Sequence, residues 1–249
     1  MRNKILQKLK LPKIIGHRGA CGLAPENTIS SLKKASSLNL SCVEVDVKIS
    51  KDSVPILFHD ESLERTTDGV GFCNQHNYLD LRKLDAGKWF DKKFANEKIP
   101  SLSECLDFLY EKKMNLNIEI KPNKKFELEN VKNIVKLINK KPKLPNYYFT
   151  SFHIESLKLI SEYLPNINRG LLIDNYISSM DDILIICEKY RCFSIGLDFN
   201  IINSQIIKFL KKNKLIITAY TINNIKIAKE LFDLGVDSIF TDRPDTIKI

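Results

Sequence analysis

Short apolar, β-branched runs alternate with longer amphipathic stretches along the whole of this chain, a pattern that few folds accommodate. Eight runs of four to seven residues have the length and composition of buried strands: 13–17, 42–48, 115–121, 147–151, 168–173, 194–198, 215–221 and 238–241. Apolar residues at helical spacing lie between most of them, at residues 28–38, 102–112, 128–139, 155–163, 179–189, 204–212 and 225–234. Eight strand–helix units in 249 residues predict an α/β fold, a (β/α)₈ TIM barrel.

The alternation breaks once, between residues 53 and 101. Residues 54–58 have the pattern of a further strand, and the following stretch, with several glycines and prolines, predicts an irregular insertion. A long insertion after an early barrel strand usually covers the mouth of the active site. We therefore predict one domain, residues 1–249, with a small insertion after the second strand at about 53–101. Few residues follow the last strand, so we expect a truncated eighth helix, which the N-terminal segment is a candidate to replace.

The charge balance is basic, with a formal net charge of +9 and a pI near 9.1. Such a balance suits nucleic acid, an anionic membrane surface or a phosphate-bearing substrate. The lysines are spread along the chain without a dense basic stripe between aromatic residues, so we predict no nucleic-acid partner. The basic residues 2–13 are compatible with a short interfacial helix, but we favour a cap over the bottom of the barrel. The oligomeric state stays open.

The cellular location is expected to be the cytoplasm. No apolar run approaches the roughly 20 residues of a membrane span, and lysines interrupt the N-terminal apolar residues before a secretory segment can form. The six cysteines are scattered, without a C-x-x-C pair or zinc-finger spacing. Reduced thiols that act mostly as small hydrophobic side chains are the favoured interpretation.

Carboxylates follow the strand pattern in a way that predicts a cation site. Glu44 and Asp46 lie two apart on the second strand and must face the same side, and Glu119 lies on the next barrel strand. Three neighbouring carboxylates without a cation would repel one another. One divalent cation, Mg²⁺ or Ca²⁺, removes that conflict because both ions prefer oxygen ligands. Zinc fits less well, because its usual ligands are histidine and cysteine.

Histidine and basic residues fall at the same predicted mouth. His17 follows the first strand and His59 follows the extra strand, so they are candidates for proton transfer near neutral pH. Arg18 and Lys121 add fixed positive charge, and arginine in particular matches the geometry of phosphate oxygens. A site that combines a cation, two basic side chains and two histidines is suited to a phosphoryl group.

These residues resemble the glycerophosphodiester phosphodiesterase family, and the likeness extends from Ile14 to Pro244. The landmarks, strongly specific in this order and spacing, are His17-Arg18-Gly19, Ala24-Pro25-Glu26-Asn27-Thr28, Glu44-Val45-Asp46-Val47, Val54-Pro55-Ile56-Leu57-Phe58-His59-Asp60, Leu63-Glu64-Arg65-Thr66-Thr67-Asp68-Gly69, Ile99-Pro100-Ser101-Leu102, Ile118-Glu119-Ile120-Lys121, Ser151-Phe152, Thr221-Ile222-Asn223 and Gly235-Val236-Asp237-Ser238-Ile239-Phe240-Thr241-Asp242-Arg243-Pro244. Tyr220 is a departure, because family members usually carry tryptophan there, at a position that commonly lines the substrate pocket. Residues 24–28 have a separate physical interpretation as a helix start, with Asn27 or Thr28 as its cap.

The resemblance implies metal-dependent hydrolysis of small-molecule glycerophosphodiesters to glycerol 3-phosphate and an alcohol. By this likeness Glu44, Asp46 and Glu119 hold the cation, while Arg18 and Lys121 neutralise the phosphate. His17 and His59 then act as general base and general acid, with His17 the expected base. Attack by the 2-hydroxyl of the glycerol, giving a cyclic phosphate, and direct attack by water both stay open.

Two other functions share the same residues. A lysophospholipase D acting on lysophospholipids at a membrane would use this site with an apolar groove beside it. A catalytically inert barrel that binds phosphorylated ligands is the third hypothesis. The complete histidine pair and acidic trio argue against an inert barrel, because such a relative is expected to have lost one of them.

Overall fold

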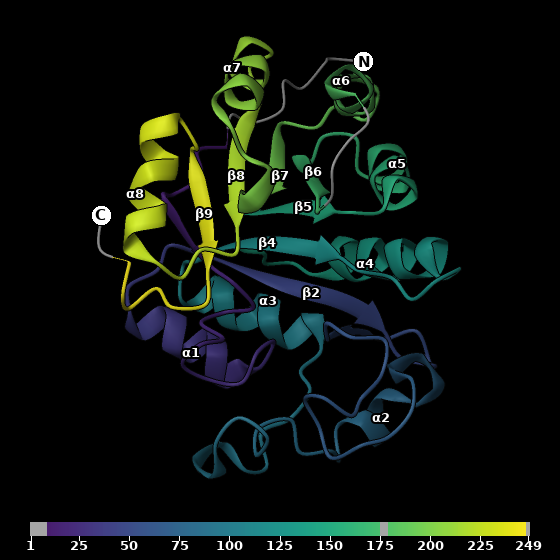
Figure 1. The fold of residues 1–249 in the computed structure, drawn as a ribbon. Helices are drawn as coiled ribbons and strands as arrows, with labels where there is room; N and C mark the ends of the chain where they lie inside the picture. The colour runs from purple at the N-terminus through teal and green to yellow at the C-terminus, as the bar shows by residue number, and fades with distance from the viewer. Residues whose placement is uncertain (1–8, 175–178, 248–249) are drawn as a thin grey trace.

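The computed structural model describes residues 9–174 and 179–247, and its centre is a closed barrel of parallel strands (Figure 1). The barrel strands are β1 (Ile14–Gly16), β2 (Cys42–Ile49), β4 (Asn115–Ile120), β5 (Tyr147–Ser151), β6 (Arg169–Ile173), β7 (Ser194–Asp198), β8 (Ile216–Tyr220) and β9 (Ser238–Thr241). Strand β1 pairs with β9 and with β2, and these pairings close the sheet on itself. The predicted (β/α)₈ TIM barrel is confirmed.

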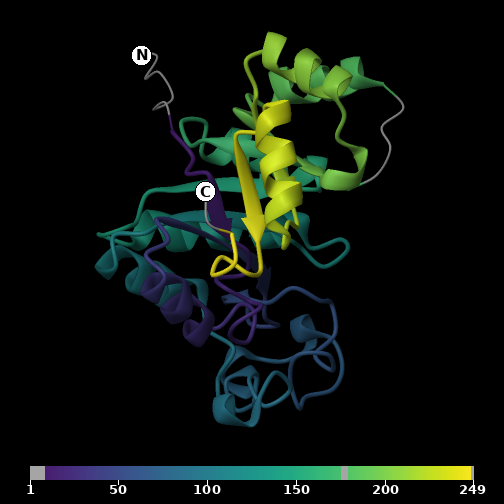
Figure 2. The same cartoon turned by 60° about the vertical axis from the view of Figure 1, so that its left-hand side comes forward.

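The insertion after β2 forms a lobe on one side of the barrel, at the bottom of both Figure 1 and Figure 2. It begins with β3 (Pro55–Leu57), which pairs antiparallel with the end of β2 so that Val47 lies opposite Leu57. Its other elements are short: η1 (Cys73–Gln75), α2 (Tyr78–Leu81) and η2 (Lys92–Phe94). The prediction of an extra strand followed by irregular chain is therefore confirmed.

Helices follow or precede the barrel strands as the apolar spacing predicts. They are α1 (Ile29–Ser37), α3 (Leu102–Glu111), α4 (Glu127–Lys140), α5 (Ile154–Tyr163), α6 (Met180–Lys189), α7 (Ser204–Lys212) and α8 (Ile225–Leu234), with the short η3 (Phe199–Ile201) after β7. Several begin at a side chain that caps the free backbone N–H groups, as Asn203 does for α7 and Asn224 for α8. Gly235 ends α8 with a φ of 110°, a conformation that favours glycine.

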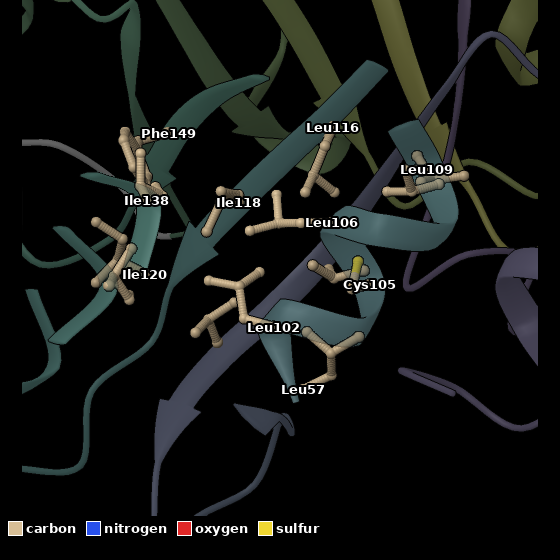
Figure 3. Close-up of a cluster of buried hydrophobic side chains, with 14 of the residues drawn as sticks. Leu57, Leu102, Cys105, Leu106, Leu109, Leu116, Ile118, Ile120, Ile138 and Phe149 are labelled. Atoms are coloured by element: carbon tan, nitrogen blue, oxygen red, sulfur yellow. The ribbon is translucent and has the colours of Figure 1, made fainter. Parts of the chain in front are cut away.

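Alternation along the strands divides the side chains between two layers. Figure 3 shows α3 packed over β4, with Leu102 and Leu106 close to Leu116 and Ile118. The intervening residues of β4 face the other way, and Glu119 lines a cavity inside the barrel mouth. The strand side chains that point out of the barrel therefore pack against the helices. Those that point into the barrel include the polar residues at its mouth.

The chain ends differ from the repeated units. The described residues after β9, 242–247, contain no helix, as expected from the short C-terminal segment. Residues 1–8 lie outside the described part, and so do the predicted interfacial helix and most of the predicted barrel cap. None of the helices in the described residues combines the length and apolar character needed to cross a bilayer.

Candidate active site

Three buried carboxylates converge at the mouth of the barrel. Glu44 and Asp46 come from β2 and Glu119 from β4, where Asp46 and Glu119 lie opposite each other in the strand pairing. One oxygen from each of the three lies within 4.8 Å of the others. Glu44 and Glu119 border a cavity of about 150 Å³ that Arg18, His17, His59, Lys121, Phe152 and Tyr220 also line. The structure thus brings together all the residues that the sequence predicts for the site.

The electrostatics of the trio favour the binding of a positive charge. Burial raises the pKa of Glu44 well above its usual value, and repulsion from Asp46 and Glu119 adds to the effect. Burial and the charge of Asp46 likewise raise the pKa of Glu119 to about 7. Oε1 of Glu44 is buried and has no hydrogen-bond partner within the described part of the chain. A divalent cation with oxygen ligands fits this donor set, so these three residues could hold one.

Two basic side chains border the trio on different sides. Nε of Arg18 lies 3.2 Å from Oδ2 of Asp46, and Nζ of Lys121 lies 3.3 Å from Oε1 of Glu119. Burial alone would raise the pKa of Asp46, but Arg18 and Lys121 outweigh it and lower this pKa well below its usual value. The pKa of Asp46 is therefore lowered, whereas the pKa values of Glu44 and Glu119 are raised.

His17 is oriented from the far end of the chain. Its Nδ1 lies 2.6 Å from Oδ1 of Asp242, which follows β9. Its Nε2 is directed towards the cavity, 4.0 Å from Oε2 of Glu44. Burial would raise the pKa of Asp242, but the hydrogen bond from His17 outweighs it and lowers this pKa. An ionised Asp242 accepts a hydrogen bond from Nδ1–H of His17, which leaves Nε2 of the ring free to accept a proton.

His59 shows the same arrangement and also lines the cavity. Its Nδ1 lies 2.5 Å from Oδ1 of Asp60, and its Nε2 lies 2.6 Å from Nζ of Lys121. Because an ammonium group can only donate, Nε2 accepts this bond and Nδ1 carries the ring proton. Burial lowers the pKa of His59, and the positive charges of Arg18 and Lys121 lower it further.

Comparison with known proteins agrees with this geometry. The model of the glycerophosphoryl diester phosphodiesterase family matches residues 17–246, which is nearly the whole chain. The chain belongs to this family. The comparisons confirm the resemblance stated from the sequence and the class of enzyme that the family name states.

Two members of the phosphodiesterase family illustrate the likeness. A glycerophosphodiester phosphodiesterase of Bacillus subtilis is 32% identical over 93% of this chain and 83% of its own length. The structure of a phosphodiesterase from Oleispira antarctica, solved in complex with the product sn-glycerol-3-phosphate, has a TM-score of 0.90 and 33% identity. That match covers 95% of both chains.

The structure corrects the interpretation of the family landmark at residues 24–28. Thr28 is the cap of α1, as one of the two candidates predicted. Asn27 instead holds Asp46, since its Nδ2 donates to Oδ2 of that carboxylate at 2.8 Å. Glu26 accepts a hydrogen bond from Nη1 of Arg18 at 2.7 Å. The segment therefore positions the site as well as starting a helix.

Sequence reasoning also missed the partners of the two histidines. No role was assigned to Asp242 or Asp60 from the sequence, although Asp242 directly follows β9 and Asp60 lies three residues after the end of β3. Position after a strand end was thus a signal that could have found both. Tyr220 does line the cavity, as expected; its hydroxyl donates to the carbonyl of Ile173 at 2.5 Å, and its ring packs edge-on against Phe152.

Proposed function

We propose that this protein hydrolyses glycerophosphodiesters to glycerol 3-phosphate and a free alcohol, using one divalent cation, Mg²⁺ or Ca²⁺. The observation that carries the proposal is the convergence of two carboxylate-anchored histidines and three buried carboxylates on one cavity. The product complex of the Oleispira antarctica relative supports the same substrate class.

In this proposal Glu44, Asp46 and Glu119 hold the cation. When bound, the cation supplies positive charge to a phosphate oxygen, which is commonly worth several kcal/mol at the transition state. Arg18 and Lys121 neutralise the remaining phosphate charge at the same mouth. The unpartnered oxygen of Glu44 and the raised pKa of Glu119 support this assignment. A cation would give that oxygen a partner and would lower the pKa of Glu119.

His17 accepts the proton of the nucleophile at Nε2. Its Nδ1 is already committed to Asp242, so the ring presents the correct nitrogen and the imidazolium that forms is stabilised by an ionised carboxylate. The nucleophile is the 2-hydroxyl of the glycerol or a water molecule. Such a positioned base typically contributes 10²- to 10⁴-fold to the rate.

His59 protonates the departing alcohol. Because the ammonium of Lys121 donates to Nε2 of His59, that nitrogen must first gain a proton from solvent. Asp46 and Asp60 favour the protonated ring, because both raise the pKa of His59 against the effect of burial. The two histidines thus transfer protons on opposite sides of the phosphate.

The first experiment is release of glycerol 3-phosphate from glycerophosphocholine, measured with EDTA and then with Mg²⁺ or Ca²⁺ restored. We expect no release with EDTA and recovery with one of the ions. Failure under every condition, in a folded and cation-loaded sample, contradicts the proposal. Lysophosphatidylcholine as the next substrate then separates a lysophospholipase D from an inert phosphate-binding barrel.

We also propose a cytoplasmic location for the protein. All six cysteines are free, which suits a reducing compartment. Cell fractionation with an antibody against the chain tests this, and recovery in a secreted fraction would contradict it.

A further inference from the structure

A second group of metal-ligating atoms lies behind His17, apart from the carboxylate trio. It consists of Nδ1 of His17, Sγ of Cys21 and the carboxylate of Asp242, all within 4.8 Å of one another. Sγ of Cys21 lies 2.8 Å from Oδ1 of Asp242 and 3.9 Å from Nδ1 of His17. His17 and Cys21 belong to the turn after β1, and Asp242 follows β9. Closure of the barrel therefore assembles three different ligand types at one point.

This donor set favours a different kind of ion than the carboxylate trio does. One nitrogen, one sulfur and one oxygen ligand are typical of Zn²⁺ and similar thiophilic ions, whereas Mg²⁺ and Ca²⁺ prefer oxygen alone. With Zn–S near 2.3 Å and Zn–N near 2.0 Å, tetrahedral geometry separates sulfur and nitrogen by about 3.6 Å. The observed separation of 3.9 Å is close to that value. The oxygen of Asp242 would have to move outward by about 1 Å for the same geometry.

The site is partly exposed to solvent, and a hydrogen bond to Oδ2 fixes the carboxylate of Asp242. The side chains of His17 and Asp242 are 17% and 27% exposed, which leaves room for water as a fourth ligand. Asn223 donates to Oδ2 of Asp242 at 2.7 Å, so Oδ1 is the oxygen directed at His17 and Cys21. Cys21 is half-buried, while the other five cysteines are buried.

We propose that His17, Cys21 and Asp242 form an inhibitory binding site for a thiophilic divalent cation such as Zn²⁺. On binding, the thiol proton of Cys21 is released to solvent and the sulfur binds as thiolate. The proton on Nδ1 of His17 moves to Nε2, and Nδ1 becomes a ligand. No electrons are transferred.

Inhibition follows because Nε2 of His17 then carries a proton and can no longer accept one. This consequence rests on the proposed role of His17 as general base, whereas the binding itself does not. The ion acts without occupying the carboxylate trio, so an excess of Mg²⁺ is not expected to relieve the inhibition fully.

The test uses the full-length protein with saturating Mg²⁺, titrated with Cd²⁺, whose charge-transfer absorbance reports thiolate ligation. We expect one equivalent to bind in the wild type, and Cys21→Ser to abolish the band. Cys192→Ser is the matched control, because the thiols of Cys192 and Cys187 hydrogen-bond each other and so form an alternative thiol site for Cd²⁺. This control should retain the band. Circular dichroism checks that each variant is folded, and Cys21→Ala serves as a second variant.

Zn²⁺ inhibition is then measured relative to the Zn²⁺-free rate of each variant. Loss of an outer-shell partner alone costs 10- to 100-fold in metal affinity, so loss of the thiolate should raise the inhibitory concentration at least about tenfold. An unchanged band in Cys21→Ser, or no band in the wild type, overturns the site. Binding that depends on Cys21 but leaves turnover unaffected supports the site and overturns the base role of His17 instead.

Discussion

At the scale of single residues, the two histidines share one device. Nδ1 of each ring is hydrogen-bonded to an aspartate, Asp242 for His17 and Asp60 for His59, and both rings line the cavity. The aspartate decides which nitrogen carries the proton, and so decides which nitrogen can do chemistry. A histidine without such a partner would populate both tautomers.

Replacing either histidine tests its proposed role in proton transfer. We expect His17→Ala and His59→Ala each to lower kcat by about 10²- to 10⁴-fold, because each removes one proton-transfer group. His76→Ala is the control, since His76 lies in the insertion with its Nε2 near the carbonyl of Val70. Steady-state release of glycerol 3-phosphate is the measurement. Near-normal turnover in either cavity variant would disprove the acid–base assignment.

Substitution of a carboxylate ligand tests the cation site. We expect Glu44→Gln to weaken Mg²⁺ binding and lower the rate together, because it removes one anionic ligand whose Oε1 has no other partner in the described chain. Calorimetric titration with Mg²⁺ gives the affinity, and Glu61→Gln in the insertion is the control. An affinity unchanged by Glu44→Gln would place the cation elsewhere.

The raised pKa of Glu119 predicts how stability depends on pH. Burial raises this pKa from 4.5 in a model peptide to about 7, so between these values the fold binds more protons than the unfolded chain. The cation-free protein should therefore lose stability as pH rises through about 7, because an uncompensated carboxylate is ionised in the interior. A bound cation compensates that charge.

We accordingly expect the rise in Tm on adding Mg²⁺ to be larger at pH 8 than at pH 6, as measured by differential scanning fluorimetry. Glu119→Gln should flatten the pH dependence of the cation-free Tm. Equal stabilisation by Mg²⁺ at both pH values would argue against a cation beside Glu119.

At the scale of elements, helix α3 links the barrel to the insertion. Its capping box joins the Oγ of Ser101 to the backbone of Glu104 and the carboxylate of Glu104 to the backbone of Ser101. The same carboxylate accepts a hydrogen bond from the hydroxyl of Tyr78 in α2 at 2.7 Å. The start of α3 therefore also anchors the insertion to the barrel.

Removing the cap should cost stability without changing the site. We expect Ser101→Ala to lower the free energy of unfolding by about 1 kcal/mol, the usual loss for a side-chain cap. Ser103→Ala makes the same chemical change inside the same helix and should be nearly neutral. Urea denaturation measures both. A loss in Ser103→Ala as large as that in Ser101→Ala would contradict the capping explanation.

At the scale of the whole molecule, the insertion has its own small core but several ties to the barrel. Seven buried hydrophobic residues, including Leu63 and Leu81, form that core. Strand β3 pairs with β2, and Arg65 of the insertion forms an ion pair with Glu26, which precedes α1. That all 249 residues form one domain stays a prediction, and these ties support it.

The single tryptophan makes this prediction measurable, because Trp89 lies within the insertion. Its fluorescence reports the lobe, while far-ultraviolet circular dichroism reports mainly the barrel helices. We expect both signals to change in one coincident guanidinium transition. A fluorescence change at lower denaturant would show that the insertion unfolds independently.

The predicted boundaries of elements were accurate to within one residue, as for β2 and α4, because local periodicity carries that information. Strand alternation likewise placed Glu44, Asp46 and Glu119 on the inner face. The chemistry of residues 26 and 27 was missed, because nothing in a segment without periodicity says which way its side chains point. Comparison with the phosphodiesterase family confirmed the fold but left the role of each residue as a proposal.

Local sequence patterns were therefore sufficient to predict the barrel, its insertion and the face on which the polar residues gather. Spacing along a strand is a short-range property, and in the folded protein it fixes the face to which each side chain points. Only the tertiary structure decided the partners: Asp242 meets His17 across 225 positions of chain because β9 pairs with β1 when the barrel closes. Cys21 joins them for the same reason. Such contacts depend on closure and on side-chain rotamers, which no local pattern records.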